Sequence, residues 1–225
     1  MSTEDTHSLD LVLSIDKPYQ WTSFDVVKKV RRILKMKKVG HAGTLDPLAT
    51  GLLIVCSGKK TKTIDSIMAD EKEYSGTFSL GATTASYDME TSPENAKDIS
   101  ALTEVQIRKT VIPFLGTITQ IPPAHSAIKV NGKRAYAEAR KGNEVELKPR
   151  TVFIKEFRIE KIELPLVYFR IVCSKGTYIR SIANDFGKAL TCGAYLHSLR
   201  RDRIGVYKVS DALTPEQLEA QYRSA

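Results

Sequence analysis

One glycine-rich stretch, residues 39–51, constrains this chain more than any other part of its sequence. It reads VGHAGTLDPLATG and lies between a basic helical pattern and an apolar run. Glycine permits backbone conformations that other residues resist, and it lets a ligand approach closely. Asp46 precedes Pro47, which biases its backbone toward an extended or turn conformation. A carboxylate held in such a loop is a candidate catalytic group, and a plain turn with a local Asp46 hydrogen bond accounts for the pattern equally well.

Composition narrows the classes of protein that the chain can belong to. A chain of 225 residues with 42% apolar and 27% charged residues suits one globular domain with a sizeable core. The net charge of +8 favours a polyanionic partner, with nucleic acid ahead of a membrane surface or acidic small molecules. Three widely spaced cysteines argue against a disulfide framework and a cysteine-rich zinc site. With no secretory signal and no membrane-length apolar run, we expect a cytoplasmic protein.

Apolar periodicity and turn residues predict a mixture of strands and helices. Short apolar or alternating runs predict strands at residues 11–15, 52–56, 73–81, 150–162 and 167–173. Helical spacing with capping residues predicts helices after Thr22 or Ser23, from Thr103 through Val111, at residues 136–140, from Ile179 to Ala189 and after Thr214. Residues 1–10 are expected to form a disordered tail.

Several polar side chains stand at positions that suit a functional site. Tyr178 and Arg180 begin a helix directly after a strand and a glycine turn, although a surface role explains Arg180 as simply. Tyr74 shares the alternating face of its strand with apolar residues, which by itself favours a half-buried core position. Three basic groups are candidate phosphate contacts. They are the helix at residues 26–38, the lysines 59, 60 and 62, and the arginines 200, 201 and 203.

The glycine-rich stretch is accompanied by shorter motifs in a fixed order. They are DKP at 16–18, KEY at 72–74, IPP at 121–123, SAIK at 126–129, Tyr136, Ala139-Arg140 and Gly142, CSKGTYIRSI at 173–182 and LRR at 199–201. With GHAGTLDPLATG at 40–51, this ordered series closely resembles the TruB family of tRNA pseudouridine synthases. The resemblance runs from about residue 11 to 205.

The resemblance implies an α+β protein with the pseudouridine synthase fold. That fold is a mixed, largely antiparallel central sheet flanked by helices, with a central basic cleft. It implies a catalytic domain at residues 11–210, followed by a short C-terminal helix at 211–225. Many bacterial members continue into a PUA domain, and we expect none here because only about twenty residues follow Gly205.

The resemblance also implies an activity, isomerisation of uridine to pseudouridine at position 55 in the T loop of tRNA. No cofactor and no metal are expected, the partner is the T stem-loop of tRNA, and a monomer without a required protein partner is expected. Asp46 matches the catalytic aspartate, and Tyr178 and Arg180 match an active-site tyrosine and arginine. The expected substrate-binding residues are His41, which fills space vacated in the T loop, Tyr74, which stacks on the target base, and Lys17, Lys62 and Leu199.

These residue types suit the reaction. An aspartate with a pKa of about 3.9 is charged at neutral pH, and a nearby arginine would keep it ionised and aimed. Whether Asp46 acts at C6 of uracil or at C1′ or C2′ of the ribose is left open by the residue types. A uridine inside a folded loop must be extruded, and stacking on an aromatic ring recovers ~1–3 kcal/mol per base.

Three other functions remain open at this point. A retaining glycosidase also uses an aspartate, but it needs a second carboxylate about 5 Å away, for which Asp88 and Asp185 are the candidates. A simple RNA-binding module explains the charge but not the setting of Asp46. An RNA-guided synthase of the dyskerin type is the nearest alternative within the resemblance, and its members carry a PUA domain and long basic tails.

Overall fold

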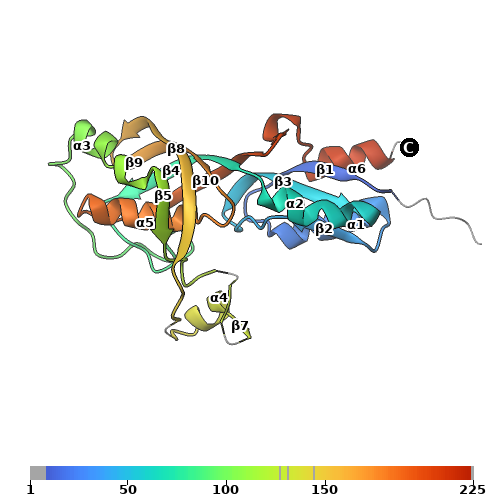
Figure 1. Cartoon of the computed structure of the whole chain (residues 1–225), viewed down its shortest axis with the longest axis horizontal. Helices are drawn as coiled ribbons and strands as arrows, with labels where there is room; N and C mark the ends of the chain where they lie inside the picture. Colours follow the sequence, from blue (N-terminus) through green and yellow to red (C-terminus); the bar gives the residue numbers. More distant parts are fainter. Residues whose placement is uncertain (1–8, 127, 131, 144, 224–225) are drawn as a thin grey trace, which may run out of the picture. The chain divides into compact units, whose positions relative to one another are not determined.

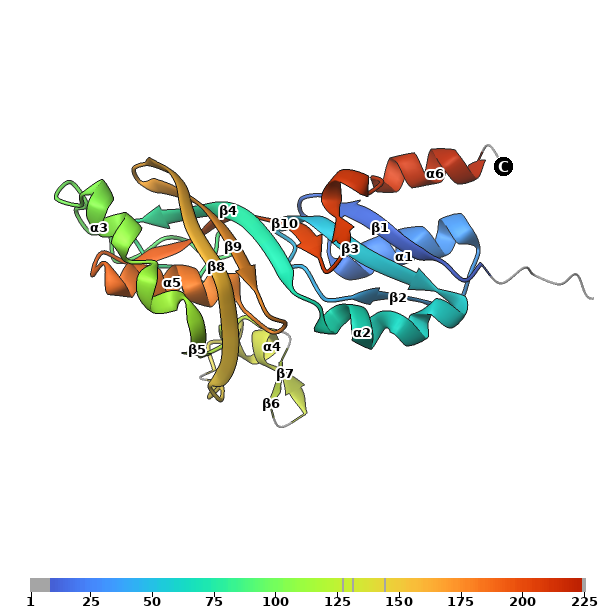
Figure 2. The same ribbon diagram turned by 45° about the horizontal axis from the view of Figure 1, so that its top comes forward.

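The computed structural model describes residues 9–126, 128–130, 132–143 and 145–223. Most of the tail expected at residues 1–10 therefore lies outside the described residues. The chain forms two compact units. We call the unit that ends at Glu73 and resumes at Arg200 the terminal unit, and Tyr74–Leu199 the central unit. Strands β4 (Lys72–Leu80) and β10 (Ala194–Ile204) each contain one of the two boundaries (Figures 1 and 2).

The terminal unit is built around the buried strand β3 (Ala49–Ser57). Strands β1 (Val12–Lys17) and β2 (Val39–Ala42) both pair with β3 in antiparallel fashion, and β11 (Tyr207–Lys208) pairs with β10. Leu53 and Val55 of β3 lie in one hydrophobic cluster, whereas Leu52, Ile54 and Cys56 lie in another. Because both faces of the strand are covered, its sequence is an unbroken apolar run rather than an alternating one.

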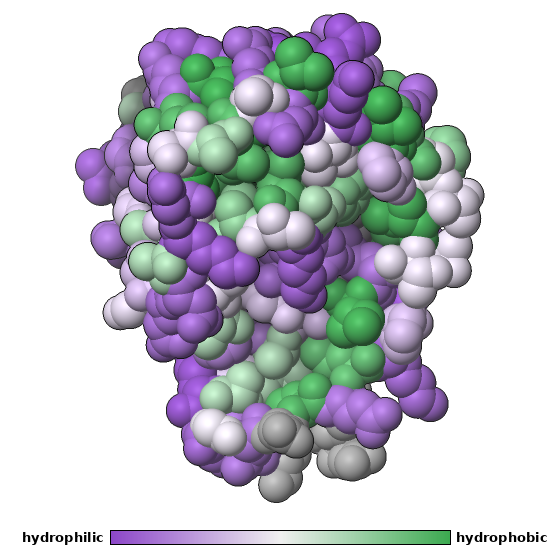
Figure 3. Space-filling model, turned by 90° about the vertical axis from the view of Figure 1, so that its left-hand side faces the viewer, coloured by the Kyte–Doolittle hydropathy of each residue, from purple (hydrophilic) through white to green (hydrophobic). Residues whose placement is uncertain are grey.

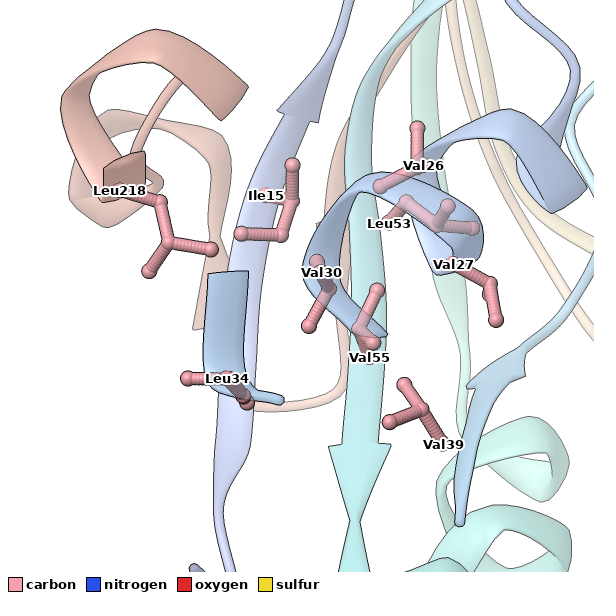
Figure 4. Packing of buried hydrophobic residues seen from close by; sticks show 9 residues of the cluster. All are labelled: Ile15, Val26, Val27, Val30, Leu34, Val39, Leu53, Val55 and Leu218. Atoms are coloured by element: carbon pink, nitrogen blue, oxygen red, sulfur yellow. The ribbon is translucent and has the colours of Figure 1, made fainter. Parts of the chain in front are cut away.

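Helix α1 (Ser23–Leu34) covers one face of this unit. Thr22, one of the two predicted capping residues, caps it in a reciprocal capping box with Asp25. Its apolar side chains pack against β1, β2 and β3 (Figure 4). The cluster comprises Ile15, Val26, Val27, Val30, Leu34, Val39, Leu53, Val55 and Leu218. The short helices η1 (Gly58–Thr63) and α2 (Ile64–Ala69) follow β3.

The C-terminal helix α6 (Pro215–Arg223) belongs to the same core. Leu218 is fully buried in the α1 cluster, and the backbone of Leu213 bonds to Ser14 and Asp16 of β1. The short helix η3 (Val209–Asp211) leads into this segment. Glu219 forms ion pairs with Lys29 and Arg32 of α1. Lys29 of the predicted phosphate-facing helix is largely covered by this contact, which corrects the prediction for that residue, whereas Arg32 is 71% exposed and stays a predicted phosphate contact.

The central unit is a sheet with a helix packed on an aromatic core. Within it β4 lies between β10 and β9 (Leu166–Cys173), and β8 (Arg150–Glu163) follows, with β5 (Gly116–Gln120) at the edge. The pairs β8–β9 and β5–β8 are antiparallel. Phe186 of α5 (Ile179–Ala189) meets Phe78, which stacks on Phe169 with ring centroids 4.2 Å apart. This packing fixes α5 against β4 and β9.

The remaining elements of the central unit are short. They are α3 (Glu104–Lys109), η2 (Ile112–Phe114), β6 (Lys129–Val130), β7 (Lys133–Arg134) and α4 (Ala135–Ala139). Val105 and Ile112 expose 60% and 63% of their surface. Figure 3 shows one face of the molecule, on which apolar and polar side chains are interspersed.

The structure confirms the α+β class and most of the predicted elements. The capping box of Thr103 and Gln106 is present, although α3 ends at Lys109 rather than Val111 because the next short helix, which contains Pro113, begins at Ile112. Strands β5 and β10 and helix α2 were missed, and residues 39–42 form a strand rather than part of a glycine loop. No helix of the described chain is long and apolar enough to cross a membrane.

The core position of α6 leads to a stability prediction. Leu218→Ala removes a fully buried side chain from the α1 cluster, so the free energy of unfolding should fall by about 2–5 kcal/mol. Urea denaturation measures this change, and Leu164→Ala, at a residue 42% exposed in the central unit, is the control. A Leu218→Ala protein as stable as its parent would contradict the assignment of α6 to this core.

Candidate active site

Asp46 lies half-buried in the loop that joins β2 to β3. Its carbonyl accepts a hydrogen bond from the backbone N–H of Ala49 at 3.1 Å, which closes a tight turn around Pro47. The local sequence favours this turn because proline fixes its own backbone and restricts the residue before it. The turn predicted around Asp46 is therefore present, and the carboxylate stands at its first position.

Helix α1 anchors this loop through Ser23. The Ser23 hydroxyl donates to the carbonyl of Leu45 at 3.1 Å and accepts from the N–H of Leu45 at 2.8 Å. Ser23 is 3% exposed, so water does not compete for these bonds. The first residue of α1 thereby fixes the backbone immediately before Asp46.

Arg201, on β10, joins the start of this loop to strand β3. Its Nε donates to the carbonyl of Leu52 at 2.8 Å, and one terminal nitrogen donates to the carbonyl of Gly43 at 3.0 Å. A Cβ at Gly51 would lie 2.4 Å from the carbonyl oxygen of Arg201, and Gly51 has a φ of +99°. Only glycine fits there. Arg201 is 1% exposed, which corrects its predicted role as a phosphate contact.

Lys17 holds the residue after Asp46. Its ammonium donates to the carbonyls of Pro18, Trp21 and Pro47 at 3.0, 2.6 and 3.3 Å. Lys17 is fully buried, so its three donors serve the protein backbone, in contrast to the substrate contact expected for it. Burial lowers the pKa of Lys17 to about 8, whereas the Asp46 carboxylate acts in the opposite direction. The two charged groups are thus close enough to interact within the terminal unit.

His41 lies on β2, half-buried and opposite Val55 of β3. Burial lowers the pKa of His41, and the positive charge of Arg201 lowers it further. A histidine whose pKa is depressed below 6.5 is neutral at neutral pH. His41 therefore offers a flat, uncharged ring, which fits its predicted packing in a vacated RNA loop. Lys62, on η1, is exposed.

A second group of candidate residues lies in the central unit around the start of α5. Arg180 is 4% exposed, donates to the carbonyl of Ser86 at 3.3 Å and lies 3.5 Å from a carboxylate oxygen of Asp88. The loop that supplies Ser86 and Asp88 is itself braced by Thr84, whose hydroxyl donates to the carbonyl of Asp88 at 2.8 Å. Arg180 is thus a buried, anchored cation rather than a surface arginine.

Tyr178, the residue before α5, is held through both its backbone and its ring. The side-chain amide of Gln120 accepts from its N–H at 2.8 Å and donates to its carbonyl at 3.1 Å. The guanidinium of Arg150 lies over its ring, 5.2 Å from the centroid. Tyr74, on β4, is 9% exposed, and Leu199, on β10, is half-buried. Both stay predictions as substrate contacts.

The structure therefore gathers the predicted residues into two sets. Asp46, His41, Lys17 and Lys62 belong to the terminal unit, and Tyr74, Tyr178, Arg180 and Leu199 belong to the central unit. Sequence reasoning missed the anchoring roles of Ser23, Arg201 and Gln120. Asp88 was considered only as a second carboxylate for a glycosidase, but the structure pairs it with Arg180. Among the described residues no cluster of three or more His, Cys, Asp or Glu side chains could hold a metal ion.

Two family models match adjacent parts of this chain and together cover residues 31–225. The model "TruB family pseudouridylate synthase (N terminal domain)" matches residues 31–179, and "tRNA pseudouridylate synthase B C-terminal domain" matches residues 180–225. The tRNA pseudouridine synthase B of Flavobacterium johnsoniae is 52% identical over 209 residues, which cover 90% of this chain and 91% of that protein. That of Parabacteroides distasonis is 50% identical over 214 residues, with coverage of 92% and 91%.

Solved structures resemble the chain as well. A chain from a Cbf5–Nop10–Gar1 complex superposes with a TM-score of 0.74 at 30% identity, over 94% of this chain and 54% of that one. A chain from an archaeal box H/ACA sRNP Nop10–Cbf5 complex gives a TM-score of 0.71 at 27% identity, over 99% and 57%. The present chain thus spans little more than half of those chains.

The anchoring of the Asp46 loop leads to a prediction for Lys17. Lys17→Met keeps an unbranched side chain but removes three hydrogen bonds that a fully buried ammonium donates to backbone carbonyls, so the free energy of unfolding should fall by about 2–5 kcal/mol. Urea denaturation measures the loss. Lys28→Met, on the exposed side of α1, is the matched control. Equal stability of the two variants would mean that Lys17 is not a structural anchor.

Proposed function

Since the chain belongs to the TruB family of pseudouridylate synthases, we propose that it converts uridine to pseudouridine in tRNA. The target that we propose is the uridine at position 55, in the T loop. The reaction breaks the bond between N1 of uracil and C1′ of ribose, turns the base, and joins C5 to C1′. The proton that leaves C5 is balanced by one gained at N1, so product and substrate are isomers and no redox partner is needed.

Asp46 is the proposed catalytic carboxylate. The observation that carries this proposal is the fixed backbone around it. Arg201 holds Gly43, Ser23 holds Leu45, and Lys17 and the N–H of Gln20 hold the carbonyl of Pro47. A reacting group set in place before the substrate arrives avoids much of the entropic cost of orientation. A loop with a purely structural role has no need of so many buried polar anchors.

The residues of the central unit are proposed to handle the base. Arg180 supplies a fixed positive charge, and Tyr178 stands two residues before it, at the junction of strand and helix. The target base must leave the stack of the T loop before it can react. We propose that Tyr74 then stacks on it and that His41, neutral at neutral pH, fills the space that the base vacates.

A second candidate function is a synthase that works inside a protein–RNA complex. The similarity to Cbf5 chains from complexes with Nop10 favours it. The tRNA pseudouridine synthase B relatives match nearly their whole length, which favours direct action on tRNA. Incubating the purified chain alone with an unmodified T stem-loop hairpin, and mapping pseudouridine, separates the two. Formation of pseudouridine without any added protein or guide RNA supports direct action. Absence of product under these conditions excludes it.

Replacement of the carboxylate is the direct test of the mechanism. Asp46→Asn keeps the shape of the side chain and removes its charge, so the single-turnover rate should fall by roughly a thousandfold or more. Hairpin affinity should stay within about threefold because phosphate contacts lie elsewhere. Asp65→Asn, at an exposed carboxylate on α2, makes the same change in charge as a control. Turnover by Asp46→Asn that is free of deamidated protein would exclude Asp46 as the essential group.

The phosphate contacts need to be reassigned because the predicted arginines bind the protein itself. Arg200 makes two hydrogen bonds to the Asp16 carboxylate, at 3.1 and 2.7 Å, and Arg203 pairs with Glu71 and Glu73 at 2.8 and 3.1 Å. Exposed lysines remain around the start of η1, where the N–H of Gly58 bonds to the carbonyl of Lys38 at 2.9 Å. The proposed contacts are Lys37, Lys38, Lys59, Lys60 and Lys62.

Removing two of these lysines should weaken tRNA binding without affecting the fold. The double variant Lys59→Gln/Lys60→Gln should reduce the slope of log affinity against log salt by about 1–2, because fewer counterions are released on binding. Titrations at several salt concentrations measure the slope. Arg203→Gln should instead lower stability, since it removes the ion pairs that Arg203 makes with Glu71 and Glu73. An unchanged slope in the lysine variant would place the phosphate contacts elsewhere.

A further inference from the structure

Gln120 is almost fully buried, with 2% of its surface exposed, and it ends the edge strand β5. No chemical role in the proposed reaction requires a glutamine at this position. Its two side-chain hydrogen bonds nevertheless go to a single residue, Tyr178. The orientation of the amide is fixed, because the Tyr178 N–H requires an acceptor and the Tyr178 carbonyl requires a donor.

The contact imitates the pairing of two strands. Tyr178 has an extended backbone, with φ −99° and ψ 109°, and it precedes the first turn of α5 without a capping hydrogen bond from its own side chain. A neighbouring strand would exchange both an N–H and a carbonyl with such a residue. Gln120 supplies both groups from one side chain. The extended backbone before α5 is thereby held in place where no strand reaches it.

Arg150, the neighbour of Gln120 across the sheet, contacts the side-chain ring of Tyr178. Gln120 of β5 pairs in register with Arg150 of β8, whose guanidinium lies over the Tyr178 ring at 5.2 Å from the centroid. The next residue, Ile121, accepts a hydrogen bond at 2.7 Å from the hydroxyl of Ser181, in the first turn of α5. Gln120, Ile121 and Arg150, which are neighbours at this end of the β5–β8 pair, therefore fix the start of helix α5.

We propose that Gln120 is a positioning residue for the pseudouridine synthase reaction. It sets the backbone of Tyr178 and, through the first turn of α5, the direction of Arg180, two residues further on. Arg180 is held from its other side by Ser86 and Asp88. The inference rests on the proposed function, because it assigns Gln120 to residues that act there. Gln120 itself touches no reacting atom.

Two substitutions of Gln120 test this role. Gln120→Ala removes both hydrogen bonds and should lower the single-turnover rate on a T stem-loop hairpin roughly ten- to a hundredfold, with hairpin affinity within about threefold. The amide hydrogen of Tyr178 should exchange faster with solvent, because its acceptor is gone. Gln106→Ala is the matched control, since Gln106 also bonds a backbone N–H, at the start of α3, and should leave the rate unchanged.

Gln120→Glu adds a pH-dependent readout that a merely structural role would not produce. An ionised carboxylate can accept from the Tyr178 N–H but faces the Tyr178 carbonyl without a donor, so the variant should be slow at about pH 8. Burial raises the pKa of such a carboxyl, and once protonated it donates again. The ratio of the variant rate to the parent rate should therefore rise as the pH falls toward about 5.5.

The possible results separate this inference from the proposed function. A parent chain that forms no pseudouridine overturns both. An active parent with Gln120→Ala within about twofold of its rate overturns the positioning role alone. If Gln120→Ala does not fold, the Gln120→Glu ratio decides, and a ratio that is independent of pH overturns the role. A ratio that rises as the pH falls, with unchanged hairpin affinity, supports it.

Discussion

The buried guanidinium of Arg201 is the interaction on which the terminal unit depends. A loop cannot satisfy its carbonyls in a sheet ladder, and carbonyls buried without a donor are costly. Arg201 binds the loop carbonyl of Gly43 and also the carbonyl of Leu52 in β3. Lys17 binds the carbonyls of Pro18, Trp21 and Pro47. Burial of these two cations is tolerated because carbonyl dipoles surround them and the Asp46 carboxylate is close to Lys17. Burial lowers the pKa of His41 and the charge of Arg201 lowers it further, so Arg201 affects both the shape of the loop and the electrostatics beside it.

The two units hold the residues for which we propose a function in the same way. In each, the backbone beside the functional side chain is bound by a buried polar group from a distant segment. Ser23 and Arg201 do this around Asp46, and Gln120 does it at Tyr178. Side chains on a restrained backbone lose little further freedom when a substrate binds, and groups held in this way act with better geometry. The anchors are themselves buried, so their hydrogen bonds are protected from competition by water.

Local signals in the sequence were sufficient to predict most helices and strands and to identify the glycine-rich motif. The box of Thr22 and Asp25 starts α1, and alternation marks β9, because caps and periodicity act over a few residues. The ion-pair partners of charged side chains could not be predicted from such local patterns. Glu71 and Arg203 are far apart in the sequence, so Arg203 was expected to be a phosphate contact although it forms internal ion pairs. Strand β10 was missed because its LHSLRRDRI run carries its charges on both faces, and tertiary pairing decided its structure.

The basic residues of this chain divide by chemistry, and this division explains why net charge is a poor guide to the RNA-binding surface that we propose. Arg200, Arg201 and Arg203 each make several hydrogen bonds of fixed direction inside the protein, a task that suits the planar, many-donor guanidinium. The exposed lysines around η1 are compact, strongly hydrated charges on flexible stems, which can follow an irregular phosphate backbone without a preformed geometry. In this chain the arginines of strand β10 bind other parts of the protein, whereas the exposed lysines beside the η1 turn are the ones that we propose to contact a polyanion. The formal charge of +8 counts both kinds alike.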